Sequence, residues 1–213
     1  MTTKLKVWNG ALTLLGHRRL SDTGEAVPAG HELTAAWDDV LAEAITEGSW
    51  NFATETVKLD YDTGITPNFG YRRVFAKPTD WVRTVMVSED EYFTYPLIHY
   101  YDDDTFFSAD NSPIYLRYVS NDTGLGYDLN NWPAKFTRFV QYELAARVCY
   151  KLTQSGSLLE QIMKGKDDAR RTALNQDSMN EPQPKFPPPS SWTMARGGGY
   201  SRRDRGNRGS FTG

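Results

Sequence analysis

The sequence predicts an α+β fold: a four-helix bundle of two N-terminal and two C-terminal helices, with an antiparallel β insertion and an extended C-terminal arm. Three observations support this prediction. Apolar residues recur at helical spacing on both sides of a central region. That region has short runs of β-branched and aromatic residues. After residue 180, proline, glycine and arginine dominate.

The chain is therefore divided into four predicted parts. Residues 1–50 form the first helical part, and residues 51–128 form the antiparallel β insertion. Residues 129–180 form the second helical part, and residues 181–213 form the Pro/Gly/Arg-rich arm.

Two helices are expected before the insertion. The first should run over about 3–15 and the second over about 30–47, where Gly48 ends the apolar pattern. The apolar positions that define them are Leu5, Trp8, Leu12, Leu15, Leu33, Trp37, Val40, Leu41, Ala44 and Ile45.

Two more helices are expected after the insertion, over about 131–154 and 157–177. Ser157 and Glu160 have the spacing of a capping box, in which each side chain satisfies the other residue's backbone N–H. The apolar positions are Phe136, Val140, Leu144, Val148 and Leu152 in the third helix, and Leu158, Leu159, Ile162, Met163 and Leu174 in the fourth.

The insertion is expected to contain consecutive antiparallel strands joined by turns rich in Asp, Asn and Gly. The expected strands are Phe52–Tyr61, Tyr71–Ala76, Thr84–Ser88, Pro96–Tyr100, Phe106–Ala109 and Ile114–Tyr118.

Charge is distributed unevenly along the chain. The 24 basic and 27 acidic residues give a net charge of −3. Six basic residues and one acidic residue follow Glu181, which leaves 18 basic and 26 acidic residues in the body. An acidic body does not suit a protein that grips nucleic-acid phosphates over a broad surface.

The cellular context is predicted from what the sequence lacks. Cys149 is the single cysteine, so no disulfide can form within one chain. The N-terminus has no apolar core of a signal peptide, and no stretch approaches the roughly 18 apolar residues of a membrane span. We therefore expect a protein made in a reducing cytoplasm, with no membrane partner.

Motifs for catalysis are weak. Asp-Thr-Gly, the tripeptide that aspartic proteases use to pair two carboxylates, occurs at 22–24, 62–64 and 122–124. Each copy stands in a turn-like context, so we favour turns over a protease. No phosphate-binding loop or nucleophile motif is present, and the three histidines share no metal-ligand spacing. The sequence predicts that the protein is not an enzyme and has no cofactor and no metal site.

Aromatic residues, 13% of the chain, are the positive signal. The insertion contains the runs EYFTY and TFF. Adjacent residues of a strand face opposite sides of the sheet, so one side would remain apolar and exposed. Such patches mark interfaces, and we favour a contact between subunits over a ligand groove.

Six segments resemble a known family in their order and spacing: ALTLLGHRRLSD, GSWNFAT, FGYRRVFAKPTDWVR, IYLRYVSN, WPAKFTRFVQYELAARVCYKLTQS and FPPPSSW. They resemble the head-to-tail connector (adaptor) proteins of short-tailed bacteriophages, the tail tubular protein A-like family. The resemblance covers about Leu5 to Trp192. Ala76–Pro78 departs from the Leu-Pro more usual in the family, and the Gly/Arg segment after Trp192 does not align.

The resemblance implies a structural adaptor of a phage virion. It implies a homo-oligomeric ring of twelve copies between the portal protein and the tail nozzle protein, at the portal vertex of the virion and in the host cytoplasm during assembly. DNA would pass through the ring during ejection without specific binding. An acidic body suits such a channel, because like charges prevent binding by counterion release.

Two sets of contact residues are expected. The arm should bind the portal through aromatic anchors and through arginines that pair with carboxylates. These residues are Phe186, Trp192, Arg196, Tyr200, Arg202, Arg203 and Arg205. The insertion should bind the nozzle, through Asp102, Asp103, Asp104, Phe106 and Phe107. The three aspartates could instead hold a hard cation, although a solvated hairpin tip is the commoner explanation.

An alternative function comes from the arm alone. A flexible Gly/Arg-rich segment with a tyrosine is typical of sequence-tolerant binding to single-stranded nucleic acid. The alternative is therefore a nucleic-acid-binding module, which salt-sensitive binding to RNA or single-stranded DNA would distinguish from an adaptor.

Overall fold

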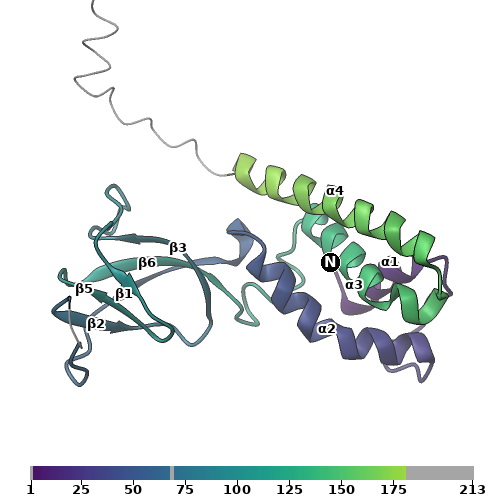
Figure 1. Ribbon diagram of the computed structural model, residues 1–213, viewed down its shortest axis with the longest axis horizontal. Helices are drawn as coiled ribbons and strands as arrows, with labels where there is room; N and C mark the ends of the chain where they lie inside the picture. The colour runs from purple at the N-terminus through teal and green to yellow at the C-terminus, as the bar shows by residue number, and fades with distance from the viewer. Residues whose placement is uncertain (1, 68–69, 181–213) are drawn as a thin grey trace, which may run out of the picture. The chain divides into compact units, whose positions relative to one another are not determined.

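The computed structural model describes residues 2–67 and 70–180, which belong to one compact unit, Met1–Asn180. Helices α1 (Lys4–Leu14) and α2 (Pro28–Thr46) precede the strands, and α3 (Ala134–Thr153) and α4 (Gly156–Asn180) follow them. Figure 1 shows the helices gathered in one region and the strands in another. The predicted arm, with its seven predicted portal contacts, lies outside the described residues.

Each helix begins where local chemistry favours it. Thr3 Oγ1 accepts a hydrogen bond of 3.2 Å from the backbone N–H of Lys6, and Pro28 occupies the first position of α2. The predicted capping box is wrong. Helix α4 begins at Gly156, and Ser155 Oγ, rather than Ser157, accepts the bond from the backbone N–H of Leu158, at 3.3 Å.

The predicted four-helix bundle of an N-terminal and a C-terminal pair is also wrong. Helices α1, α2 and α4 each pack mainly against α3, so α3 is a central helix rather than one of four equivalent members. The reason lies in its buried residues, which surround the helix instead of forming one stripe. Sequence analysis identified the row from Phe136 to Leu152 and missed Phe139 and Ala145, which are also fully buried.

Aromatic rings fix the base of α3. The Phe136 ring centroid lies 4.8 Å from that of Trp50, 4.7 Å from that of Phe52 and 5.0 Å from that of Trp132. The indole N–H groups of Trp50 and Trp132 each donate a 2.9 Å hydrogen bond, to the carbonyl oxygens of Ala44 and Gly126. These rings join the end of α2, the start of the strands and the start of α3 into one core.

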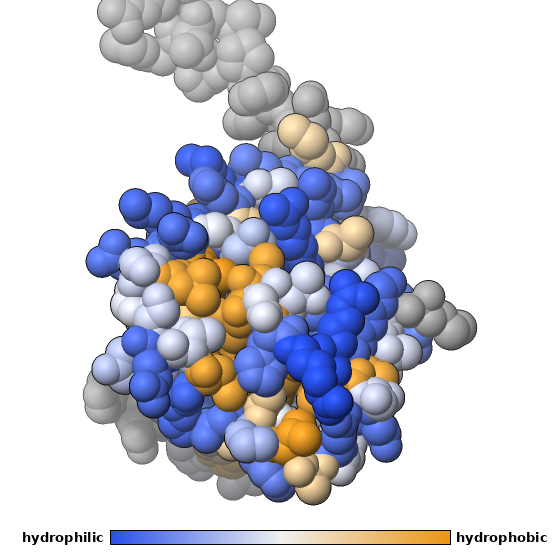
Figure 2. Space-filling model, turned by 90° about the vertical axis from the view of Figure 1, so that its right-hand side faces the viewer, coloured by the Kyte–Doolittle hydropathy of each residue, from blue (hydrophilic) through white to orange (hydrophobic). Residues whose placement is uncertain are grey.

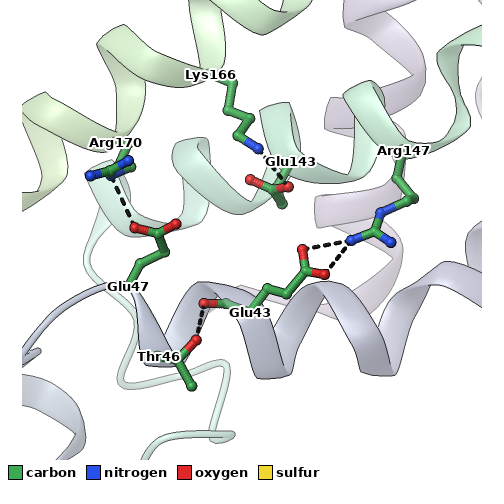
Figure 3. Close-up of polar contacts among 7 residues, drawn as sticks. All are labelled: Glu43, Thr46, Glu47, Glu143, Arg147, Lys166 and Arg170. Carbon is green, nitrogen blue, oxygen red and sulfur yellow. Dashed lines mark hydrogen bonds and ion pairs between the residues drawn. The ribbon is translucent and has the colours of Figure 1, made fainter.

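Ion pairs on the outside of this core connect α2, α3 and α4 (Figure 3). Glu43 pairs with Arg147 at 2.5 Å, and this hydrogen bond raises the pKa of the Arg147 guanidinium. Glu47 pairs with Arg170 at 3.1 Å. These two exposed pairs contribute little stability each. The buried carboxylate of Glu143 forms an ion pair with Lys166 Nζ at 2.9 Å. Loss of that lysine would leave a buried charge unpaired.

The strands form two three-stranded antiparallel sheets. One has the order β1 (Thr54–Leu59), β6 (Ile114–Ser120), β3 (Trp81–Ser88). The other has the order β2 (Arg73–Ala76), β5 (Phe106–Ala109), β4 (Tyr101–Asp102). Only β4 and β5 pair as neighbours in the chain, so the expected run of consecutive antiparallel strands is wrong.

Five of the expected strands overlap observed ones, but the strand expected at Pro96–Tyr100 does not. Pro96 makes only an isolated bridge to Ser88. Proline has no N–H to donate to a ladder, which explains why pairing stops there. The strand starts instead at Tyr101.

A second core lies within the strand region. Its buried residues are Phe75, Val87, Leu97, Phe107, Ala109, Ile114, Leu116 and Tyr118. The helical core reaches the strands through Ala53 and Val119, which explains why the helices and strands form one compact unit. None of the helices in the described stretches has both the length and the apolar character needed to cross a membrane.

Substitution of Phe136 tests the aromatic base of the helical core. We expect Phe136→Ala to lower the free energy of unfolding by about 3–5 kcal/mol, because it leaves a cavity among Trp50, Phe52 and Trp132. Tyr150→Ala, at a position 64% exposed on the same helix, should change it by about 0.5 kcal/mol or less. Urea unfolding measures both, and a loss below about 1 kcal/mol for Phe136→Ala would contradict the assigned role.

Candidate interaction surface

Large apolar side chains are exposed together in one segment, which we call the aromatic loop and define as residues 89–101. This segment follows β3 and ends at Tyr101, the first residue of β4. Their exposed fractions are 81% for Tyr92, 73% for Tyr95, 79% for Ile98 and 59% for Tyr101. Elsewhere in the described stretches, large exposed apolar residues are scattered: Tyr61, Tyr150, Met163 and Met179. The concentration in one loop is therefore a property of this part of the fold.

Asp90 holds the first half of the aromatic loop. One of its carboxylate oxygens lies 2.6 Å from Ser88 Oγ, and the carboxylate accepts bonds from the backbone N–H groups of Thr94, at 3.1 Å, and Tyr95, at 3.5 Å. The Ser88 hydroxyl, with the Thr94 and Tyr95 groups, lowers the pKa of Asp90 from 3.8 to about 2. The loop is thus a hydrogen-bonded turn around a carboxylate.

Two residues of this loop, Phe93 and Leu97, turn towards the sheet. Phe93 has a positive φ of 54°, and the Arg117 guanidinium carbon lies 4.5 Å from its ring centroid. Leu97 is buried, and its N–H donates to the Val87 carbonyl at 2.8 Å. Because Phe93 and Leu97 face the sheet, the side chains of Tyr92, Tyr95 and Ile98 are left in solvent.

The predicted acidic tip lies next to this loop. The backbone N–H of Asp103 donates to the Phe106 carbonyl at 2.9 Å, which closes the turn between β4 and β5. Asp102 pairs at 2.5 Å with Lys77, whose side chain is only 5% exposed. Lys77 Nζ also lies 3.7 Å from the Trp81 ring centroid. Asp103 and Asp104 are exposed and make no ion pair with another described residue.

The five residues expected to bind the nozzle do not share one environment. Asp102, Asp103 and Asp104 are exposed, and Phe106 is half-buried. Phe107 is fully buried, with its ring 6.1 Å from Tyr100 and 6.5 Å from Trp81. Phe107 therefore supports this surface from below instead of forming part of it.

Sequence analysis expected exposed aromatic residues in this segment, but it missed Asp90 and placed Ile98 in a strand, Pro96–Tyr100, that does not form. The available signal was local. Ser88 and Asp90 precede Thr94 and Pro96, and this composition favours a turn with a side-chain cap over a strand.

A second apolar surface lies at the end of the helical region where α1 and α3 finish and α4 begins. Figure 2 views the molecule from that side and shows apolar residues gathered in the middle of the face, with hydrophilic residues around them. Leucines of these three helices, Leu14, Leu152, Leu158 and Leu159, are only partly buried against the helical core. The described unit thus has apolar surfaces at both its helices and its strands.

Two acids and a tyrosine meet on the strand region. Tyr118 Oη lies 3.1 Å from carboxylate oxygens of both Glu55 and Asp80. Burial raises the pKa of Tyr118, and the charge of Asp80 adds to this. Ser120 Oγ donates a hydrogen bond to the same Asp80 carboxylate. Asp80 thus connects the segment between β2 and β3 to β6.

The three Asp-Thr-Gly copies are turns. Asp62 and Asp122 accept hydrogen bonds from the N–H of the glycine two residues later, at 2.8 and 2.7 Å, and Asp22 accepts one from Thr23 at 2.7 Å. Within residues 2–67 and 70–180, no group of three or more His, Cys, Asp or Glu side chains is placed to hold a metal ion.

Comparison with protein-family models and with curated proteins found no match to this chain.

The lowered pKa of Asp90 predicts how the aromatic loop responds to acid. Since the folded-state pKa lies below the ordinary 3.8, the contribution of Asp90 is present above about pH 4 and is lost as the pH falls through about 2. The amide NMR shifts of Thr94 and Tyr95 should therefore titrate with a midpoint near pH 2.

Two variants control this titration. Asp90→Asn keeps an acceptor oxygen but removes the charge, so both amide shifts should become independent of pH in this range. Asp90→Ala removes the acceptor, so both amides should shift at every pH. A midpoint near 4 in the original protein would contradict the hydrogen-bonded geometry.

Proposed function

We propose that this protein is a structural adaptor of a phage virion, which forms a ring between the portal and the tail nozzle and lets DNA pass through. The observation that carries the proposal is the aromatic loop, where Tyr92, Tyr95, Ile98 and Tyr101 are exposed side by side in the sequence. Tyrosine is enriched at protein interfaces, and apolar patches of this kind mark binding surfaces. A loop fixed by Asp90 and Leu97 presents them without a large ordering cost.

The sequence segments that resemble head-to-tail connectors point to the assembly in which such surfaces would be used. A ring of about twelve copies needs neighbouring copies on two sides and different partners above and below. We assign the nozzle to the strand region and the portal to the arm, residues 181–213. The free protein stays a monomer until it meets the portal, because its acidic body resists premature association.

The charge of the body fits a channel for DNA. With 18 basic and 26 acidic residues up to and including Glu181, the body repels phosphates overall. The Gly/Arg composition of the arm favours a second candidate, binding of single-stranded nucleic acid. The two candidates make opposite predictions for the partner that the arm binds.

Removal of the arm separates these candidates. A chain truncated after Asn180 should lose binding to purified portal of the phage that encodes it, because the aromatic anchors Phe186, Trp192 and Tyr200 are gone. Pull-down on immobilised portal, with the full chain alongside, measures this. Unchanged portal binding would contradict the proposal. A truncation that instead abolishes salt-sensitive binding of the full chain to single-stranded DNA would favour the second candidate.

Substitution of the aromatic loop tests the nozzle surface. Tyr92→Ser combined with Tyr95→Ser should weaken binding to purified nozzle about 30-fold or more, since the loss of even one tyrosine at the centre of an interface costs about 2 kcal/mol. The unfolding free energy should hardly change, because both rings are exposed. Tyr150→Ser, an equally exposed tyrosine on α3, is the matched control and should bind normally. Normal binding by the loop variant would exclude this surface.

A further inference from the structure

One side of α3 is left open over its N-terminal half. Helices α1, α2 and α4 cover three sides, and a groove of about 670 Å³ remains between α1 and α3. A smaller hollow of about 170 Å³ between α3 and α4 shares Arg138 and Tyr142 with it. Because the two hollows share these residues, they form one depression, which we call the α3 groove.

The α3 groove is basic. Lys6, Arg19 and Arg138 line its larger part, and Lys135 lines the smaller. None of these four forms an ion pair with another residue in the described stretches. The one acidic residue of the lining, Asp168, already pairs with Arg171 at 2.8 Å. Four cations therefore face this depression without internal anions.

Two glycines give the groove its floor. A Cβ atom at Gly10 of α1 would lie 2.3 Å from the Gln141 side chain, and one at Gly165 of α4 would lie 2.4 Å from the Tyr142 ring. The side chains of Gln141 and Tyr142 therefore occupy the space that a side chain at Gly10 or Gly165 would need. The floor is flat and partly polar, which suits a helix surface better than an apolar ligand.

Helix α2 carries the opposite charge on the opposite side. Its charged residues, Glu32, Asp38, Asp39 and Glu43, are all acidic, and so is Glu47, which caps its C-terminus. Glu43 pairs with Arg147 of α3, nine residues after Arg138. At about 100° per residue, nine residues turn the helix through two and a half turns, so the groove and α2 lie on opposite sides of α3.

The outer face of α2 carries two aspartates that are available to a partner. Asp38 and Asp39 are exposed and form no ion pair within the described part of the chain, whereas Glu32, Glu43 and Glu47 pair with α3 or α4. Ala35 and Ala42, also exposed, stand one turn on either side of these aspartates. Small side chains allow another surface to approach the helix closely.

We propose that the α3 groove of one copy receives the outer face of α2 of a second copy, with Asp38 and Asp39 against Arg138 and Lys135. This inference rests on the ring of the proposed function and names its contact between subunits. Charge complementarity selects the occupant, because the arm of this chain, rich in arginine, would be repelled by the groove.

The geometry of this contact is head-to-tail. The groove and the face that fills it are different surfaces on opposite sides, so each copy can bind one neighbour on each side. Repetition with a closing rotation gives a ring. The exposed ion pairs set register and association rate more than affinity, while Leu14 and Tyr142 supply apolar contact.

Cross-linking of cysteine variants tests the contact in the full chain. Cys149 is fully buried, so it does not compete for a thiol reagent. Copies carrying Arg138→Cys are mixed with copies carrying Asp39→Cys and treated with a short bismaleimide, which traps covalently the transient contacts of copies that are monomeric at equilibrium away from the portal. We expect mixed covalent dimers at about ten times the yield of a control mixture, in which Asp60→Cys replaces Asp39→Cys. Equal yields in the two mixtures would overturn the proposal.

Charge reversal in the same assay tests the chemistry. In the cross-linking pair, Lys135→Glu in the groove copy should cut the yield about tenfold, and Asp38→Lys added to the other copy should restore it. Failure of the second change to restore the yield would contradict the assigned pairing.

These outcomes are distinct from the fate of the proposed function. Cross-linking without portal binding would leave the contact standing and remove the adaptor assignment. Portal binding without cross-linking above the control would keep the adaptor and remove this contact.

Discussion

The burial of α3 on nearly all sides is the constraint on which the rest of the structure depends. Phe136, Phe139 and Val140 face in different directions and are all buried, so one neighbouring helix cannot cover them. Helices α1, α2 and α4 together do so, and the rings of Trp50 and Trp132 close the base. Because Trp50 and Phe52 lie just before β1, the same contacts orient the strand region relative to the helices.

This arrangement determines which surfaces remain for partners. Three covering helices leave one flank of α3 open, and that flank collects unpaired cations, while the outer face of α2 collects unpaired anions. In the strand region, the second core takes Phe107 and Leu97 inward and leaves Tyr92, Tyr95 and Ile98 outside. The complementary unpaired charges of the α3 groove and of α2 therefore lie in the helical region, and the aromatic loop lies in the strand region. Such a division suits a protein that meets its own copies through one region and a different protein through the other.

The sequence was sufficient to predict the positions of helices and most strands, but not how the helices pack or which strands pair. The four helices begin and end within a few residues of their predicted bounds, and Phe106–Ala109 is a strand with the predicted bounds. The predicted bundle was wrong because α3 was assigned a single apolar stripe, and only tertiary contacts show that Phe139 and Ala145 are covered as well. The sheet order failed because β6 pairs with β1 and β3, which lie far from it in the chain, and period-two patterns do not identify such partners. Of the candidate surface, the aspartates and the tyrosines could be predicted from composition, whereas the burial of Phe107 could not.

The account claims, above all, that this molecule works as one of many copies held between other proteins. The most direct test is the mass of the complex that the full chain forms with purified portal rings in solution, measured by mass photometry. The account predicts a single discrete complex whose added mass corresponds to about twelve chains. A mixture in which the portal keeps its own mass and the chain stays single at saturating concentration would contradict it.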